Sequence, residues 1–169
     1  MTLLNGTSLT GAGLHRVNGG TLNVATLVTI NPSFELAPGG TLDGTNTAIF
    51  TGTFTWSGGA MDSTGGGGRT VLTNSASMSI NTPNQKLLYR RVVDNYTIAN
   101  WSGGQIISGG NGQIWNNKTG SVFDIQGDLS LAWASFGNFL IFSNDGTLKK
   151  SSGPGVASLG AIVTNSATV

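Results

Sequence analysis

The chain has 169 residues, of which 27 are glycine and only 9 % are charged, and its formal net charge is +1. Glycine is about twice as frequent as in ordinary globular proteins, and charge about a third as frequent. The lack of cysteine excludes disulfide scaffolds and cysteine-based zinc sites, and the near balance of acids and bases argues against nucleic acid as a partner.

The sequence predicts neither a signal peptide nor a membrane span. Residues 1–6 lack the basic and apolar segments of a signal peptide, and no window approaches about 18 uninterrupted apolar residues, so we predict no membrane span. Residues 164–169 have the pattern of a strand interior. We therefore expect residues 1–169 to form a single repeat domain that is a fragment of a longer chain.

A glycine-pair motif recurs along the chain. Residues 19–23 (Gly-Gly-Thr-Leu-Asn) are followed by similar segments at 39–43, 58–62 and 103–107. The spacing is about 20 residues, with one interval of about two units, and such a period is typical of stacked repeats. Dividing the chain by 20–22 residues predicts about eight units.

Each unit has the pattern of strands. Alternation of apolar and polar residues predicts strands at residues 53–56, 77–80, 122–125 and 129–131. Residues 84–93 are the best candidate for a helix, but Val92 and Val93 and the tandem arginines favour a strand pair. Residues 83–96 depart from the repeat and are expected to be an insertion or an irregular coil.

These features predict an all-β parallel β-helix, or β-solenoid, of about eight coils. Strands of successive coils would stack at about 4.8 Å, with inward side chains in columns. We expect Leu22, Leu42 and Met61 to form one such column, continued by a residue near Met78 and then by Ile106.

Three segments carry a resemblance to a known family: residues 54–59 (Phe-Thr-Trp-Ser-Gly-Gly), 101–104 (Trp-Ser-Gly-Gly) and 115–128. They resemble the repeats of large secreted bacterial β-strand-repeat proteins, which are adhesin-like and similar to the β-helix passengers of autotransporters and filamentous haemagglutinins. The resemblance spans about Gly52 to Lys150. It implies an extracellular or cell-surface location and a modular place in a longer polypeptide, and it supplies no catalytic residues.

The aromatic and basic residues give the candidate contacts for a glycan or a protein partner, namely Trp101, Tyr89, Arg90 and Arg91. Trp56 and Trp101 share a repeat position, and outward rings two coils apart would suit stacking on sugars. A core position is the favoured alternative for both, because Phe54 shares the face of Trp56. For the arginine pair, the favoured alternative is one solvated arginine and one that stacks over an aromatic ring or caps carbonyl groups.

Carbohydrate lyases and hydrolases also use β-helices, so pairs of acidic residues are candidate catalytic groups. Asp43 and Asp62 occupy equivalent places in neighbouring units, and Asp124 and Asp128 flank one corner. The position of Asp43 and Asp62 after an apolar residue favours turn capping. His15 is the only histidine, and a surface strand position is favoured for it over a catalytic role.

The sequence thus predicts a structural or adhesive segment of a secreted bacterial surface protein or fibre. We expect it to bind glycans or cell-surface proteins and to associate end to end through unpaired strand edges, for which residues 2–9 and 158–169 are candidates. We predict no enzyme activity, cofactor or metal site. The alternatives are a polysaccharide lyase or hydrolase, and an ice-binding protein with threonine arrays at residues 45–47 and 51–55.

Overall fold

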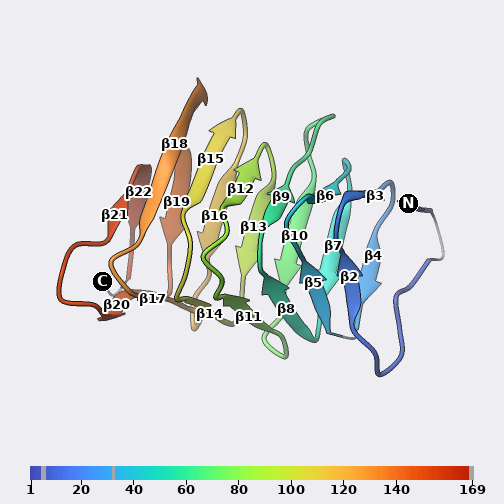
Figure 1. The fold of residues 1–169 in the computed structure, drawn as a ribbon, viewed down its shortest axis with the longest axis horizontal. Coiled ribbons are helices and arrows are strands. Elements are labelled where there is room, and N and C mark those ends of the chain that lie inside the picture. Colours follow the sequence, from blue (N-terminus) through green and yellow to red (C-terminus); the bar gives the residue numbers. More distant parts are fainter. Residues whose placement is uncertain (5–6, 32, 168–169) are drawn as a thin grey trace.

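The computed structural model describes residues 1–4, 7–31 and 33–167. The chain winds about seven times around one axis, and each turn adds a strand to three parallel sheets (Figure 1). The predicted all-β solenoid is therefore confirmed, with about seven turns against the expected eight. The described residues contain no helix, and hence none long and apolar enough to cross a membrane.

The strands divide among the three sheets as follows. Sheet A, in spatial order, contains β1 (Thr2–Leu3), β3 (Gly20–Val24), β6 (Gly40–Asp43), β9 (Gly59–Met61), β12 (Lys86–Tyr89), β15 (Ile106–Gly110), β18 (Ser130–Gly137) and β21 (Ser158–Leu159). Sheet B contains β4 (Val28–Ile30), β7 (Thr47–Phe50), β10 (Arg69–Leu72), β13 (Val92–Asn95), β16 (Ile114–Asn117), β19 (Leu140–Asn144) and β22 (Ala161–Asn165). Sheet C contains β2 (His15–Val17), β5 (Phe34–Leu36), β8 (Thr53–Trp56), β11 (Ser77–Ile80), β14 (Ile98–Trp101), β17 (Val122–Gln126) and β20 (Thr147–Ser152).

The predicted column on sheet A is confirmed over its first three members. Leu22 pairs with Leu42, and Leu42 with Met61, in parallel register. All three side chains are buried, because alternate residues of a strand point to the same side and here that side is the interior. The column continues through Leu88 to Ser108.

The predicted continuation of this column was wrong. Met78 lies in sheet C, where its strand neighbours are Phe54 and Ala99. Ile106 pairs with Lys86 and so belongs to the adjacent inward column of sheet A. Met78 was misplaced because residues 62–68, between β9 and β10, and residues 81–85, between β11 and β12, lengthen this turn of the solenoid beyond the assumed 20–22 residues. Ile106 was misplaced because four residues, 102–105, connect β14 to β15, whereas only residues 57 and 58 connect β8 to β9.

Residues 84–93 are confirmed as a strand pair. They contribute β12 and the first half of β13, and both strands pair in regular register with their neighbours on both sides. The irregular coil expected over residues 83–96 lies mostly earlier in the chain, in the two long connections at residues 62–68 and 81–85.

The repeated glycine pairs sit where strands enter sheet A. A Cβ atom added to Gly40 would lie 2.3 Å from the carbonyl oxygen of Val17, and one added to Gly59 would lie 2.3 Å from the carbonyl oxygen of Gly40. Gly59 also has a φ of 74°, which side chains disfavour. At Gly40 and Gly59 the corner between sheets C and A is therefore too tight for a side chain, which explains the second glycine of the motif on these two turns.

The interior is aromatic in both halves of the solenoid. Phe34, Phe50 and Phe54 form a cluster with ring centroids 4.6–5.3 Å apart. Further along the axis, Phe123 packs edge-on against Trp115 at 5.0 Å. Each such buried side chain contributes about 1.5–3 kcal/mol by leaving water, so these columns supply most of the driving force for coiling.

One inward column of sheet B changes its chemistry along the axis. Ile30, Phe50 and Leu72 occupy the early turns. The same column then holds four asparagines, Asn95, Asn117, Asn144 and Asn165. The amide Nδ2 of each donates to the Oδ1 of the next, at 2.9, 2.7 and 2.6 Å. We call this set the asparagine ladder.

Candidate functional site

Tyr89 and Arg90 lie at the corner where β12 leaves sheet A. The Tyr89 ring meets Phe136 edge-on at 5.2 Å, and burial, aided by the charge of Asp62, raises the pKa of the Tyr89 phenol. Arg90 adopts a left-handed backbone with a φ of 55°. Its Nε and Nη2 donate to the two carboxylate oxygens of Asp62 at 2.8 and 2.5 Å, and these hydrogen bonds raise the pKa of Arg90.

Arg91 turns into the interior and is fully buried. Its guanidinium donates to the carbonyl oxygens of Asp62 and Arg69 at 3.0 and 2.8 Å, and to that of Gly44 at 3.2 Å. Its Nε donates to Thr70 Oγ1 at 2.8 Å. Desolvation lowers the pKa of Arg91 to about 10, and its hydrogen bonds join three turns of the solenoid.

Trp101 is also fully buried. Its indole N–H donates to the carbonyl oxygen of Gly104 at 2.9 Å, and its ring packs near Phe123. The strand alternation that places Ile80 and Ile125 inward places Trp101 inward too. Of the four predicted contact residues, Trp101 and Arg91 thus have no surface to offer a ligand, and such a contact stays a prediction for Tyr89 and Arg90 alone.

The four acids considered for catalysis have separate structural partners. Asp43 Oδ1 accepts the backbone N–H of Gly44 at 2.6 Å, and several hydrogen bonds lower the pKa of Asp43 despite its partial burial. Asp62 caps the next residue in the same way and binds Arg90. The turn-capping role favoured from the sequence is therefore confirmed for both.

The second pair of acids binds two different lysines. Asp124 lies 3.6 Å from Lys149, and Asp128 lies 3.0 Å from Lys150. The pKa of Asp124 is lowered because hydrogen bonds, chiefly from Gln126, and the charge of Lys149 outweigh the effect of its burial. The hydrogen bond from Lys150 is the main cause of the lowered pKa of Asp128.

The charged side chains join neighbouring turns throughout the molecule. Each acid has a hydrogen-bond or ion-pair partner, the seven being Glu35, Asp43, Asp62, Asp94, Asp124, Asp128 and Asp145. Within residues 1–4, 7–31 and 33–167, six ion pairs form, and all of them connect residues that lie on adjacent turns. No group of three or more metal-ligating side chains occurs among the described residues.

His15 and the threonine array at residues 51–55 do not form a common site. His15 lies at the head of an inward column above Phe34 and is half-buried. The outer row of sheet C that contains Thr55 is chemically mixed, and runs Glu35, Thr55, Ser79, Asn100, Asp124 and Lys149. Thr55 is therefore not part of a threonine lattice in this row.

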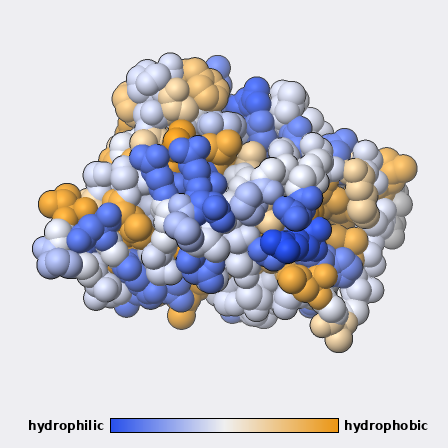
Figure 2. Space-filling model, viewed as in Figure 1, coloured by the Kyte–Doolittle hydropathy of each residue, from blue (hydrophilic) through white to orange (hydrophobic). Residues whose placement is uncertain are grey.

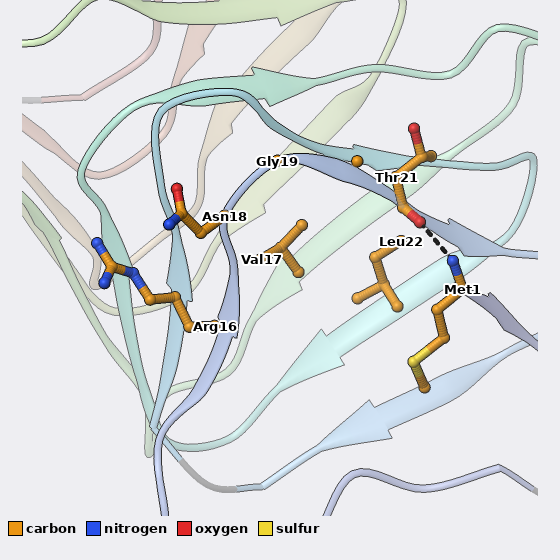
Figure 3. A pocket seen from close by; sticks show the side chains of 8 residues that line it. Met1, Arg16, Val17, Asn18, Gly19, Thr21 and Leu22 are labelled. Atoms are coloured by element: carbon orange, nitrogen blue, oxygen red, sulfur yellow. Dashed lines mark hydrogen bonds between the residues drawn. The ribbon is translucent and has the colours of Figure 1, made fainter.

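A depression of about 340 Å³ opens at the N-terminal end of the solenoid (Figure 3). Residues 16–22 and Met1 line it. The Met1 ammonium donates to the carbonyl oxygen of Thr21 at 2.8 Å, and Arg16 on its rim pairs with Glu35 at 3.1 Å. Its two charged groups, the Met1 ammonium and the Arg16 guanidinium, thus already have partners within the chain.

Exposed large apolar side chains gather at the two ends. Four lie in the first turn or before it, namely Met1, Leu4, Leu14 and Leu27. Seven lie in the last two turns, namely Trp133, Phe136, Phe139, Ile141, Val156, Ile162 and Val163. Between them only Tyr96 and Ile98 are exposed among the described residues. Figure 2 shows hydrophobic colours at both ends and at the tip of β18, with a mostly polar middle.

The C-terminal end also leaves the interior uncovered. Val163 extends the inward column of Trp115 and Phe142, yet 42 % of its surface is exposed because no further turn lies over β22 among the described residues. At the opposite end, β1 covers β3, and Leu9 bridges to Ile30. The N-terminal face is therefore partly covered and the C-terminal face open. The predicted edge residues 5, 6, 168 and 169 lie outside the described residues.

Comparison of the chain with protein-family models, with curated proteins and with solved structures finds no match.

Proposed function

We propose that this chain is a structural and adhesive segment of a secreted bacterial surface protein or fibre. The observation that carries the proposal is the division of its surface into two apolar ends and a polar middle. Solvated sides suit a rod that stands in water, whereas contiguous exposed apolar groups mark interaction sites. The secreted setting rests on the resemblance of residues 54–59, 101–104 and 115–128 to bacterial β-strand-repeat proteins.

The ionic groups support a structural role over a catalytic one. A general acid or nucleophile needs a carboxyl group that is free to meet a substrate, whereas the carboxylates here cap turns or bind arginine and lysine on adjacent turns. Such contacts fix the stacking of one turn on the next. A rod held together in this way displays its surface over an extended length, which suits adhesion.

End-to-end association is the second part of the proposal. The edges β20, β21 and β22 present unpaired backbone groups at the C-terminal end, and exposed parallel edges are templates for further pairing. Val163 adds an apolar contact on the same face. A second copy that docks here would cover both, and repeated docking of unlike ends would produce an open filament.

The test is sedimentation velocity across a range of protein concentrations. We expect the wild-type chain to associate as concentration rises, and Val163→Lys to stay monomeric because a charge on an edge strand blocks pairing. Ile98→Lys is the matched control, since Ile98 is exposed on β14 in the middle of the solenoid, away from both ends, and should leave association unchanged. A wild-type chain that is monomeric at every concentration would remove this part of the proposal.

A further inference from the structure

The corners between sheets B and C differ in length on three consecutive turns. Four residues, 73–76, connect β10 to β11, and four, 118–121, connect β16 to β17. Both form tight turns, closed by hydrogen bonds from Ala76 N to Thr73 O at 3.0 Å and from Ser121 N to Lys118 O at 2.9 Å. Between them, only Tyr96 and Thr97 connect β13 to β14.

The short corner leaves a hollow between its two longer neighbours. The hollow has a volume of about 370 Å³ and is lined by Val71, Thr73, Asn74, Tyr96 and Thr119. We call these five residues the Tyr96 notch. The size lies within the range of small-molecule sites, and the notch stands midway along the rod, far in sequence from the apolar ends.

The backbone holds Tyr96 firmly at the base of this hollow. Its N–H donates to the carbonyl oxygen of Leu72 at 3.0 Å, and on the next turn Lys118 N donates to the carbonyl oxygen of Asn95 at 2.9 Å. The Tyr96 side chain is nevertheless 45 % exposed. Because the backbone at Tyr96 is already fixed, a ligand that binds the exposed ring has to order only the side chain.

The polar groups of the notch include several that are available to a ligand. Thr73 Oγ1 donates to the carbonyl oxygen of Phe50. The side chains of Asn74, Tyr96 and Thr119 make no hydrogen bond within the described part of the chain. An amide, a phenol and a hydroxyl offer both donors and acceptors, and none of the five lining residues is charged at neutral pH.

The exposed Tyr96 ring and the uncharged polar groups beside it fit a neutral sugar better than the other classes of ligand. An aromatic ring supplies an apolar face with a polar tip, which matches the C–H face and hydroxyl rim of a pyranose. A peptide strand would require a free sheet edge, and the strands here are paired on both sides. An anionic ligand would require free cations, whereas neighbouring Lys118 lies 3.9 Å from Asp94.

We propose that the Tyr96 notch binds one pyranose unit of a neutral glycan, with the sugar stacked on Tyr96 and hydrogen-bonded to Asn74 and Thr119. This inference specifies the ligand class for the adhesive part of the proposed function and is independent of end-to-end association. A single shallow site of this kind gives weak binding, of the order of 1 mM, which a surface fibre strengthens by repetition.

The experiment titrates the ¹⁵N-labelled 169-residue chain with methyl glycosides of galactose, glucose, mannose and N-acetylglucosamine, and follows backbone amide shifts. At least one glycoside should shift the amides of residues 73–75, 96–97 and 118–120. Tyr96→Ala should weaken that binding at least about tenfold, whereas Tyr96→Phe should retain most of it. Ile98→Ala is the matched control, because Ile98 is 52 % exposed but lies outside the notch.

Three results would overturn the assignment: no shift with any of the four glycosides, shifts confined to the chain ends, or equal loss of binding in Tyr96→Ala and Ile98→Ala. Sedimentation of Tyr96→Ala should match that of the wild type. The failure of the glycan site is thus distinguishable from the failure of end association, which the Val163→Lys variant tests separately.

Discussion

The early and late turns of the solenoid fill the same inward column of sheet B in opposite ways. Phe50 and Leu72 occupy it with apolar rungs, and Asn117 and Asn144 occupy it with amides that bind one another. Apolar rungs stabilise the fold through burial, in proportion to their area and without directional demands. Amide rungs stabilise it only while every buried donor and acceptor has a partner.

The difference shows two ways of fixing one turn upon the next. An apolar column tolerates small shifts, whereas the asparagine ladder specifies register, because a slip of one residue would leave several buried amides unsatisfied. The ladder also stabilises the corners. Asn95 and Asn117 donate to the carbonyl oxygens of Val122 and Thr147, each on the following turn, at 3.2 and 2.9 Å.

The largest effect is expected in the apolar half. Phe50→Ala removes a fully buried ring that contacts Phe34 and Phe54, and should lower the free energy of unfolding by about 3–5 kcal/mol through lost burial and a residual cavity. Urea unfolding followed by far-UV circular dichroism measures this loss. Thr29→Ala, on the solvent side of β4, should change it by less than about 0.5 kcal/mol.

The asparagine ladder should be nearly as sensitive to an apolar replacement. Asn117→Leu keeps the side-chain volume but removes four hydrogen bonds, with Asn95, Ser121, Asn144 and Thr147. We expect a loss of about 2–3 kcal/mol in the same urea assay, because buried partners remain unsatisfied.

The end of the ladder provides the matched control for this substitution. Asn165 is exposed and has only one bond within the ladder, which its Oδ1 accepts from Asn144 at 2.6 Å, so Asn165→Leu should cost about 1 kcal/mol, less than Asn117→Leu. If Asn117→Leu were as stable as the wild type, the two halves of the column would be energetically equivalent, and the contrast between them would fail.

Lys86 offers a further test of how a polar group is tolerated inside the solenoid, because it is a charged residue in an otherwise apolar column of sheet A. It is fully buried beside Ile106, and its Nζ donates to the carbonyl oxygens of Thr82 and Gly103. Desolvation lowers its pKa from the ordinary 10.5 to about 8. Between these two pH values the unfolded chain binds more protons than the folded one, so stability should rise with pH.

The expected gain is about 2–3 kcal/mol between pH 8 and pH 10.5, measured by urea unfolding at several pH values. Lys86→Met is the control, because it keeps the side-chain shape without the titrating group. The difference in stability between wild type and Lys86→Met should move in favour of the wild type as the pH rises. A constant difference would show that the lysine titrates alike in both states.

The architecture was accessible from the sequence, whereas the full course of each column was not. The glycine pairs predict the corners, and the alternation at residues 53–56 and 77–80 predicts strands. Leu22, Leu42 and Met61 form one column, as predicted. Met78 and Ile106 did not, because a fixed period cannot accommodate the longer connections at residues 62–68, 81–85 and 102–105. Corner length is a local property of each turn, and the mean repeat conceals it.

The candidate sites were harder to predict than the fold. Adjacent Arg90 and Arg91 look equivalent in sequence, but a left-handed corner directs one to Asp62 outside and the other to carbonyl groups inside. The asparagine ladder had a detectable signal, an apolar residue two positions before each asparagine, as in Val93 and Asn95 or Trp115 and Asn117. The Tyr96 notch had none, because it depends on the lengths of three neighbouring corners.

By itself, the sequence determined the class of the molecule. Its glycine content, low charge and repeat spacing favour short strands wound into a parallel solenoid, since periodicity and turn chemistry are properties of neighbouring residues. The tertiary structure alone decided which side chains share a rung, which charges meet on adjacent turns and where the surface is hollowed. Those features depend on contacts between residues roughly one turn apart, and every change in turn length shifts them.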